Sequence, residues 1–362
     1  TAPPPPLLLL TSGAVAVRCG AGAAALSGAA HGGSWGFARV LRLEQPAARV
    51  LSADVLRDTG AAAAVGALLS EAASSGGGGS AEAEVAWAGG RCHGARLRRR
   101  GVEAATAVAS GGVAAGVWLV TGGLGGLGLR GAALLASRGA TCLVLTSRSG
   151  LVARGGQGLE ASLRAVGLSG GSTAVVTCDG GDAAEAAALA ALVRPARVLH
   201  AAGVLSDRLL QGLSASHVAS PFQPKAGGAA HLHAATAPAC VQALVLFSSV
   251  ASTVGNAGQA NYAAANACLD ALVRCRGAGG LVASSLQLPL VGGVGMGQAT
   301  MDSLRINSAW SLGLEQYAAC LNSVMHGCGT VRAPLPLLPA QLGLAMHPSV
   351  GALALLGELA AS

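Results

Sequence analysis

The sequence has little charge and few aromatic side chains, and its absences exclude several classes of protein. Charged residues make up only 11% of the 362 residues and hydrophobic residues 52%, which excludes a disordered chain. No apolar stretch reaches the roughly 18 residues that a membrane span needs, because Gly, Ser and Arg interrupt each one. Nine cysteines form no CxxC pair, which argues against a structural zinc site and against a disulfide framework. We therefore expect a globular chain of about two domains, with no metal and no membrane partner, in the cytoplasm.

Lysine and a few other residue types are so rare that the survivors are informative. The chain has one lysine, Lys225, three phenylalanines and two tyrosines. Such depletion of residues with AT-rich codons is typical of a GC-rich genome. The segment 222–266 nevertheless holds the lysine, two of the phenylalanines and one of the tyrosines. This clustering makes the segment the first place to look for chemistry.

The net charge of +7 favours an acidic partner or a phosphorylated ligand. The basic stripe at 96–100 has no interleaved aromatic residues for base stacking, so we expect a solvated face or linker there and no nucleic-acid partner. The opening TAPPPPLLLLT is too short for a signal peptide and lacks its basic leader. The absence of a starting Met suggests a piece of a longer polypeptide.

The composition changes near residues 101–115, between two halves of different character. The first half has strand-like runs at Ala14–Val17 and Glu84–Trp87, and no glycine fingerprint or convergent polar set, so we expect it to be structural. Helical periodicity appears at Trp35–Leu43 and again at Ala61–Ala73. The flexible loop SSGGGGS follows.

The second half alternates short apolar runs with Ala- and Leu-rich helical segments. This pattern predicts an α/β domain with a Rossmann-like, doubly wound parallel sheet whose ligand crevice lies at the carboxyl ends of the strands. The expected strands are Val117–Thr121, Cys142–Ser147, Ala174–Cys178, Val198–His200, Ala243–Ser248 and Val282–Leu288.

The first of these strands is followed by TGGLGGLG, a dinucleotide fingerprint in its proper context. Gly123, Gly125 and Gly128 allow a tight turn, close approach of a pyrophosphate and packing of a helix on the strand. At the end of the second strand, Arg148 favours the 2′-phosphate of NADP, with a surface arginine as the alternative. Asp179 after the third strand is either an adenine acceptor or a helix N-cap.

Four polar residues in the second half suggest catalysis. Tyr262 and Asn266 lie four apart on one face of a predicted helix, and Ser249 ends a strand where it can reach the crevice. Lys225 lies near the start of another helix. Taken singly, each has a structural alternative: a helix cap for Ser249, a core aromatic for Tyr262, a surface position for Asn266 and a snorkelling side chain for Lys225.

The arrangement resembles that of short-chain dehydrogenases, except that Asn266 stands where they carry lysine. The motifs GGLGGLG, HAAGVLSD, PKAGGAAHL and FSSVASTVGNAGQANYAAANACLDAL resemble more closely the ketoreductase domain of type I polyketide synthases, which exchanges the two positions. The resemblance is strong over 117–271. It extends more faintly over the first half, which is similar to that family's truncated, Rossmann-like structural subdomain. It departs at SLQLPLVGGVGMG, where the family has a Trp-Gly segment near the substrate lid.

The resemblance implies three parts: a structural subdomain at 1–110, a catalytic NADPH-binding subdomain at 111–328 and a tail or linker at 329–362. It implies NADPH as cofactor and, as partners, neighbouring synthase domains and an acyl carrier protein with a phosphopantetheine-tethered β-ketoacyl substrate. His200 is expected to be structural. The implied cofactor residues are Thr121, Gly123, Gly125, Gly126, Leu127, Gly128, Ser147, Arg148, Asp179, Ala201, Ala202, Gly203, Lys225 and Tyr262.

The family's mechanism gives each catalytic residue an expected role. Tyr262 would donate a proton to the substrate carbonyl oxygen, and Ser249 a second hydrogen bond to it. The Lys225 ammonium would lower the pKa of Tyr262. Asn266 would hold a water or backbone group in a proton relay.

Asp207 and Asn261 match the markers of B-type ketoreductases, and position 254 is Val where A-type enzymes carry Trp, so a 3R hydroxyl is expected. The alternatives are a free-standing NADP-dependent short-chain alcohol dehydrogenase and a reductase-inactive structural domain of a synthase. Intact Lys225, Ser249 and Tyr262 argue against an inactive domain. The expected structural first half and the missing Met argue against a free-standing enzyme.

Overall fold

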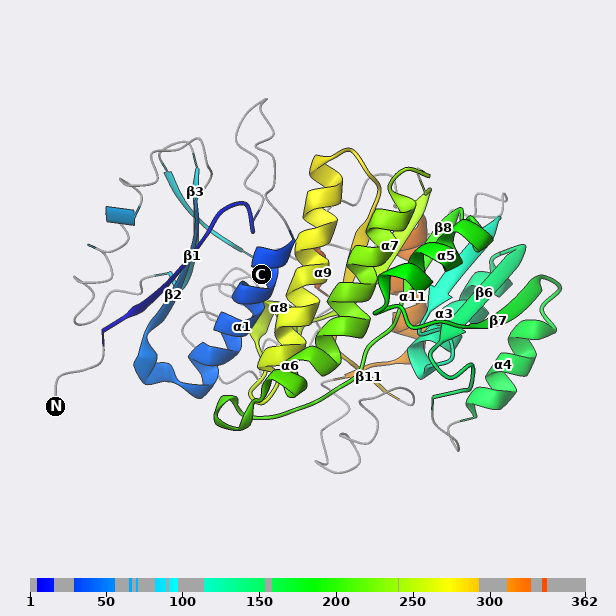
Figure 1. The fold of residues 1–362 in the computed structure, drawn as a ribbon, viewed down its shortest axis with the longest axis horizontal. Helices are drawn as coiled ribbons and strands as arrows, with labels where there is room; N and C mark the ends of the chain where they lie inside the picture. Colours follow the sequence, from blue (N-terminus) through cyan, green and yellow to red (C-terminus); the bar gives the residue numbers. More distant parts are fainter. Residues whose placement is uncertain are drawn as a thin grey trace.

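In the described part of the chain, the computed structural model contains three β-sheets: one of seven strands, one of four, and the two-stranded pair of β11 (Leu290–Val291) and β12 (Ser311–Leu312). The two larger sheets lie on either side of a pair of adjacent helices (Figure 1). The structure describes residues 5–15, 29–55, 65–66, 70, 82–88, 91–96, 114–153, 158–239, 241–292, 311–326 and 334–336.

The larger sheet has seven parallel strands in the order β13-β10-β9-β8-β5-β6-β7 among the described residues. The strand order reverses between β5 and β8, which is where ligands bind in doubly wound sheets. The strands are β5 (Val117–Thr121), β6 (Cys142–Ser147), β7 (Ser172–Thr177), β8 (Arg197–His200), β9 (Ala243–Ser249), β10 (Ser284–Leu288) and β13 (Pro334–Pro336).

Helices cover both faces of this sheet, and the alternation of side chains along the strands divides the core in two. In β5, Trp118 and Val120 face one core and Leu119 the other. The first core receives α3 (Gly126–Ser137), α4 (Leu159–Gly167) and α11 (Leu314–His326). The second receives α5 (Ala183–Val193), α7 (Gly228–Thr236) and α9 (Ala260–Ala278). The remaining elements of this part are η2 (Leu210–Gly212), α6 (Ala215–Phe222), η3 (Gln223–Gly227), α8 (Ala251–Val254), β11 (Leu290–Val291) and β12 (Ser311–Leu312).

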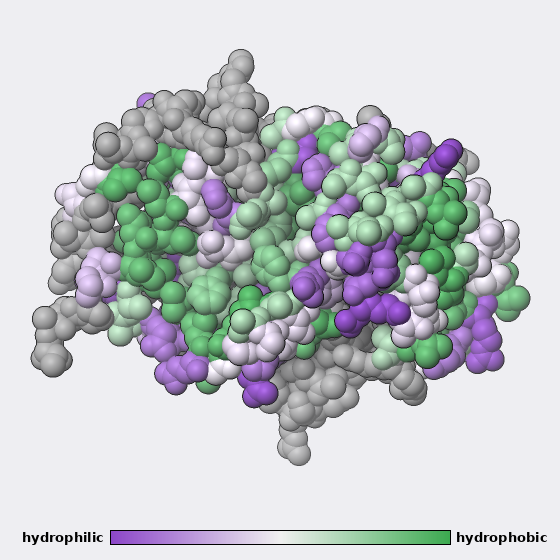
Figure 2. All heavy atoms as spheres, viewed as in Figure 1, coloured by the Kyte–Doolittle hydropathy of each residue, from purple (hydrophilic) through white to green (hydrophobic). Residues whose placement is uncertain are grey.

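The four-stranded sheet has the order β1-β2-β3-β4. A helix lies between its first and second strands in the chain. The strands are β1 (Leu7–Thr11), β2 (Val50–Val55), β3 (Glu84–Ala88) and β4 (Arg91–Gly94), with α1 (Ala30–Glu44) and η1 (Pro46–Ala48) between β1 and β2. Figure 2 shows apolar side chains gathered over these strands. Leu7 and Leu10 of β1 are about half exposed.

Helix α1 and helix α9 pack side by side and join the two parts of the molecule (Figure 1). The contact is made of small residues. A Cβ atom added at Gly36 would lie 2.4 Å from the carbonyl oxygen of Ala263, and one at Gly32 would lie 2.6 Å from that of Ala267. The backbones approach so closely that only glycine fits at these two positions of α1.

The structure confirms the doubly wound sheet and locates each of the six predicted strands of the second half within two residues. The predicted strand Ala14–Val17 is wrong for its described residues. Ala14 and Val15 lie in a bend after β1, where their N–H groups donate to the buried carboxylate of Asp54. Gly13, with φ of 76°, ends the strand before them. Most of the predicted helix Ala61–Ala73 lies outside the described residues.

Part of the segment interpreted as a tail or linker, 329–362, belongs to the sheet. Residues Pro334–Pro336 form β13, which pairs in parallel with β10. The Pro-rich run 333–339 has few N–H groups to donate, and such a strand is tolerated at a sheet edge, where β13 lies.

Candidate active site

The turn after β5 has the geometry of a dinucleotide-binding turn. Gly122 has φ of 65°, and a Cβ atom there would lie 2.6 Å from the backbone nitrogen of Ala202 in the neighbouring segment. A Cβ atom at Gly128 would lie 2.1 Å from the carbonyl oxygen of Gly122. The turn and the first turn of α3 therefore pack together only if positions 122 and 128 are glycine. The fingerprint pattern counted Gly123 and Gly128 but omitted Gly122, whose positive φ shapes the turn.

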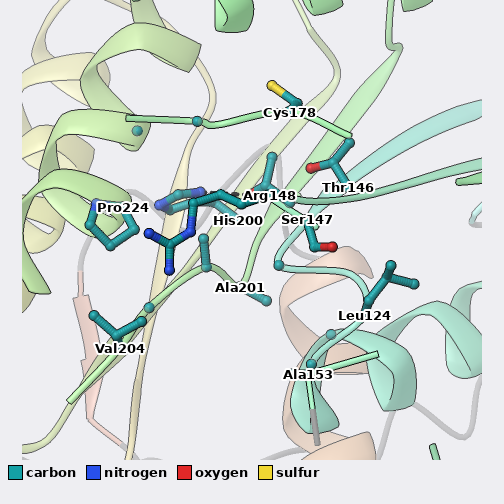
Figure 3. A pocket seen from close by; sticks show the side chains of 18 of the residues that line it. Leu124, Thr146, Ser147, Arg148, Ala153, Cys178, His200, Ala201, Val204 and Pro224 are labelled. Atoms are coloured by element: carbon teal, nitrogen blue, oxygen red, sulfur yellow. Dashed lines mark hydrogen bonds between the residues drawn. The ribbon is translucent and has the colours of Figure 1, made fainter. Parts of the chain in front are cut away.

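A cavity of about 790 Å³ opens at the carboxyl ends of β5, β6, β7 and β8 (Figure 3). The N-terminal turn of α3 borders it, so backbone N–H groups and the positive end of the helix dipole face the cavity. This arrangement fits a dinucleotide. The predicted cofactor residues that line it are Thr121, Gly125, Gly126, Leu127, Gly128, Ser147, Arg148, Asp179, Ala201, Ala202 and Gly203.

Three predicted cofactor residues lie outside this lining. Gly123 lies beneath the turn, with its N–H donating to the Thr146 carbonyl at 3.0 Å. Lys225 and Tyr262 lie beyond Gly203: a Cβ atom on Gly203 would lie 2.9 Å from Cε of Lys225. The small residue expected to admit a cofactor thus also makes room for the lysine.

The polar residues that border the cavity include Ser147, Arg148 and Asp179, and two of these three accept hydrogen bonds from nearby backbone N–H groups. The exposed side chain of Arg148 extends across the cavity towards His200 and Pro224 (Figure 3). Ser147 Oγ accepts a hydrogen bond from the N–H of Gly150 at 3.0 Å. The carboxylate of Asp179 accepts one from the N–H of Gly181 at 2.9 Å.

The alternative role for Asp179 as a helix N-cap is not observed. Helix α5 is capped by Asp182, whose carboxylate accepts from the N–H groups of Ala184 and Glu185. Asp179 instead borders the cavity.

Lys225 is placed by an irregular turn within a longer helical segment. Helices α6 and α7 are joined by the π-helical turn η3, which contains Lys225. Pro221 and Pro224 lack the N–H groups that a regular helix needs here, which explains the wider turn. The side chain is only 3% exposed, and Nζ donates to the Phe247 carbonyl of β9 at 2.7 Å. Lys225 is therefore buried and does not snorkel to the surface.

The four predicted catalytic residues converge from three elements. Nζ of Lys225 lies 5.4 Å from the centroid of the Tyr262 ring. Ser249, at the end of β9, is 9% exposed, and its Oγ accepts from the N–H of Ala251 at 3.2 Å, so it also supports the first turn of α8. Asn266 is fully buried, which excludes a surface role, and its Nδ2 donates to the Tyr262 carbonyl at 2.8 Å. Its Oδ1 has no hydrogen-bond partner among the described residues.

Burial is the largest influence on the pKa values of Tyr262 and Lys225. Burial raises the pKa of the phenol, while the polar side chains of Asn266 and Ser249 act in the opposite direction. Burial also lowers the pKa of Lys225 to about 7, against a smaller upward effect of Asp270. Lys225 is not among the groups that shift the Tyr262 pKa here, and burial outweighs the lowering effects of Asn266 and Ser249, so the expected effect of Lys225 on this pKa stays a prediction.

His200 is structural, as expected, and it supports the lysine turn. It is 1% exposed and lies between the hydroxyl of Thr121, at 2.6 Å from Nδ1, and the carbonyl of Lys225, at 3.0 Å from Nε2. Burial, with a smaller contribution from Lys225, lowers its pKa to about 4, so the ring is neutral at pH 7. No local pattern around His200 indicates that this residue connects β5, β8 and η3.

The two predicted stereochemical markers take part in one hydrogen-bond network. Asp207 accepts from Nε2 of Gln259 at 2.9 Å. Asn261 is fully buried, and its Nδ2 donates to the carbonyls of Ser206 and His217 at 2.8 and 2.7 Å. Asn261 therefore fixes the segment that carries Asp207. Gln259 had not been singled out, because a lone glutamine in a loop carries no sequence signal.

Two features are absent from the part of the chain that the structure describes. Within those residues, His, Cys, Asp and Glu form no group of three that could hold a metal ion. Nor is any helix there long and apolar enough to cross a membrane.

The fold and the site are those of a dinucleotide-binding reductase. Comparisons with known proteins identify the family. Residues 116–293 match the KR domain family model. A solved structure of A-type ketoreductases from a modular polyketide synthase is 33% identical, with a TM-score of 0.78, and the match covers 98% of this chain and 74% of that one. The first ketoreductase of the tylosin synthase is 31% identical, with a TM-score of 0.74 over 93% of this chain and 71% of that one.

Curated relatives agree. Polyketide synthase GfsA of Streptomyces halstedii is 36% identical over 98% of this chain, and spectinabilin polyketide synthase system protein NorB of Streptomyces orinoci is 44% identical over 52% of it. The chain spans 5% and 9% of the length of these two proteins. It belongs to the ketoreductase domain family of type I polyketide synthases, within the short-chain dehydrogenase/reductase superfamily, and it is an oxidoreductase of that family.

Proposed function

We propose that the chain uses NADPH to reduce the β-keto group of a β-ketoacyl thioester tethered to the phosphopantetheine of an acyl carrier protein. The observation that carries this proposal is the convergence of Tyr262, Ser249 and Lys225 beside the cavity that the glycine-rich turn and the start of α3 border. NADPH, when bound, supplies a hydride to the keto carbon.

Tyr262 acts as the proton donor. The carbonyl oxygen gains negative charge as the keto carbon is reduced, and the proton of the phenol passes to that oxygen. The raised pKa of Tyr262 keeps the phenol protonated at neutral pH until this charge develops. Ser249 donates a hydrogen bond to the same oxygen and stabilises the charge in a site from which water is largely excluded.

Lys225 and Asn266 act on the tyrosine. After proton transfer, Tyr262 is a phenolate, and Lys225, with Nζ 5.4 Å from the ring centroid, stabilises the negative charge when it is protonated. The unpaired Oδ1 of Asn266 is a site for a water that returns a proton to Tyr262.

The preference for NADPH is assigned to Arg148, whose exposed guanidinium lies across the cavity. The variant Arg148→Ala should weaken binding of NADPH by about tenfold and leave binding of NADH unchanged, because only NADPH carries the 2′-phosphate. Arg138→Ala, which removes an exposed arginine at the end of α3, is the control. Equal affinity of the Arg148 variant and the native chain for NADPH would contradict this assignment.

We also propose B-type stereochemistry, with a 3R hydroxyl as product. Asp207 and Asn261 support this through their shared network beside Tyr262. Neighbouring synthase domains and an acidic carrier protein are the proposed partners, and the net charge of +7 suits the latter.

Product analysis tests the reaction and its stereochemistry together. The chain is incubated with a small β-ketoacyl thioester and NADPH, and the β-hydroxyacyl product is resolved by chiral chromatography. We expect consumption of NADPH and a predominantly 3R product. A 3S product would contradict the stereochemical assignment, and absence of any product would contradict the reaction.

A further inference from the structure

Two loops flank Tyr262, and a single side chain from the first part of the chain connects them. The first loop, 204–213, follows β8, carries Asp207 and includes the short helix η2. The second, 255–259, leads into α9 and carries Gln259. Glu44, the last residue of α1, accepts a hydrogen bond from the N–H of Gly258 at Oε1 and one from the N–H of Leu210 at Oε2, both at 2.7 Å.

The two loops also bind each other directly. The N–H of Arg208 donates to the Gly258 carbonyl at 2.7 Å, and Gln259 Nε2 donates to Asp207 at 2.9 Å. Gly258, with φ of 81°, accordingly carries one bond to Glu44 and one to Arg208. The position of Asp207 thus depends on a turn that Glu44 holds from the other part of the molecule.

The connected loops lie close to the proposed reacting group. Asn261, in the first turn of α9 and two residues after the second loop, accepts from the N–H of Tyr262 and donates to the carbonyl of Ser206 in the first loop. The carboxylate of Asp207 is near enough to Tyr262 to raise the pKa of its phenol. A shift of either loop would therefore alter where a substrate lies relative to Tyr262.

We propose that Glu44 is a positioning residue for the substrate site: its carboxylate ties the 204–213 and 255–259 loops together and so determines substrate affinity and the facial selectivity of reduction. This inference rests on the proposed function. It gives the first part of the chain, which carries no cofactor fingerprint, a defined effect on the site. The two hydrogen bonds from backbone N–H groups to this carboxylate are charge-assisted, so each is stronger than a hydrogen bond between neutral groups.

The test compares Glu44→Gln and Glu44→Ala with native protein, and uses Glu84→Gln as a matched control. Glu84 is also a half-buried carboxylate of the first part, but it pairs with Arg39 and Arg42 and has no hydrogen bond to either loop among the described residues. The control measures the effect of losing a carboxylate of the first part whose hydrogen bonds go to α1 and not to the loops. Glu44→Gln keeps the shape and one acceptor oxygen, so it remains useful if Glu44→Ala fails to fold. NADPH binding by fluorescence reports an intact cofactor site in each variant.

Kinetics and product analysis form the first readout. For Glu44→Ala we expect KM for a β-ketoacyl thioester to rise about tenfold, kcat to change less than twofold, and the minor enantiomer to increase severalfold. Glu44→Gln should lie between Glu44→Ala and the native chain. Glu84→Gln should have native KM and native enantiomeric ratio. Native KM and native enantiomeric ratio in both Glu44 variants would overturn the proposal, even if their stability falls.

Hydrogen–deuterium exchange forms the second readout and does not need turnover. Peptides covering 204–213 and 255–262 should exchange at least tenfold faster in Glu44→Ala than in native protein, and at the native rate in Glu84→Gln. Unchanged exchange in Glu44→Ala would overturn the proposal. If the native chain reduces no thioester, the proposed function fails, and exchange alone then decides whether Glu44 holds the loops.

Discussion

At the scale of single residues, the unusual feature is a buried lysine with no carboxylate in direct contact. Lys225 is 3% exposed, and its Nζ donates only to a backbone carbonyl among the contacts observed in the described residues. A charged ammonium in such a place opposes folding, and a pKa of about 7 expresses that cost. The position is best explained by a role in the reaction at the expense of stability.

Lys225→Met should therefore stabilise the protein and reduce its activity. In native protein the folded pKa lies below the unfolded value of 10.5, so the unfolded state binds more protons between pH 7 and 10.5. Native stability rises with pH through this window and is lowest, with respect to Lys225, at and below pH 7. The advantage of the variant should be largest there, with an upper bound of about 5 kcal/mol, and should shrink towards pH 10.5.

Thermal unfolding of both proteins from pH 6 to 10 measures this advantage. A variant less stable than native protein at pH 7, or an advantage that grows with pH, would contradict the account in which burial of the charged Lys225 ammonium destabilises the fold.

The individual site residues were named from sequence, but their electrostatics could not be. Motif spacing identified Tyr262, Ser249, Asn266 and Lys225. It could not reveal that burial is the largest influence on the pKa values of Tyr262 and Lys225, because burial depends on residues distant in the chain. Glu44 and Gln259 likewise acquire their roles only through contacts with loops that the fold brings to them.

At the scale of elements, the contact between α1 and α9 should tolerate no added side chain. Gly36→Ala places a methyl group 2.4 Å from the carbonyl oxygen of Ala263, so one helix must move. We expect a loss of stability of about 1–3 kcal/mol, despite the better helix propensity of alanine. Urea unfolding measures the change.

Gly167→Ala is the control for helix propensity. Gly167 ends α4, and a Cβ atom there would contact nothing within 4 Å. This variant should be as stable as native protein or up to about 1 kcal/mol more stable. If the two variants behaved alike, the close packing of α1 on α9 would not be a stabilising contact.

The elements of the second half were easier to predict than those of the first for a physical reason. Strands β5 and β9 are buried on both faces and read as continuous apolar runs. Strand β2 contains Ser52 and Asp54, which are buried because Arg42 and Thr11, distant in sequence, hydrogen-bond to them. Those partners are invisible to a local pattern, so β2 was missed. Strand β1 was missed because it is a short run of leucines directly after four prolines, with no alternation of apolar and polar residues.

At the scale of the whole molecule, the two sheets should unfold together. Their junction combines the close α1–α9 contact with the bonds of Glu44 to Gly258 and Leu210. Unfolding of one part would expose the small-residue face of the helix, α1 or α9, that belongs to the other part. It would also leave Glu44, or the N–H groups of Gly258 and Leu210, without their partners. We expect one calorimetric transition for the full chain, with equal calorimetric and van't Hoff enthalpies. Two separate transitions would mean that the parts are independent.

The proposed role of Tyr262 as the proton donor to a keto oxygen is tested by comparing NADPH oxidation by native protein and by Tyr262→Phe. The assay uses a small β-ketoacyl thioester, with NADPH affinity measured separately. The variant removes one oxygen atom and keeps the ring beside Lys225. We predict that turnover falls at least a hundredfold while NADPH binds with nearly native affinity. Turnover by Tyr262→Phe at a rate close to that of native protein would contradict the assignment of the proton donor.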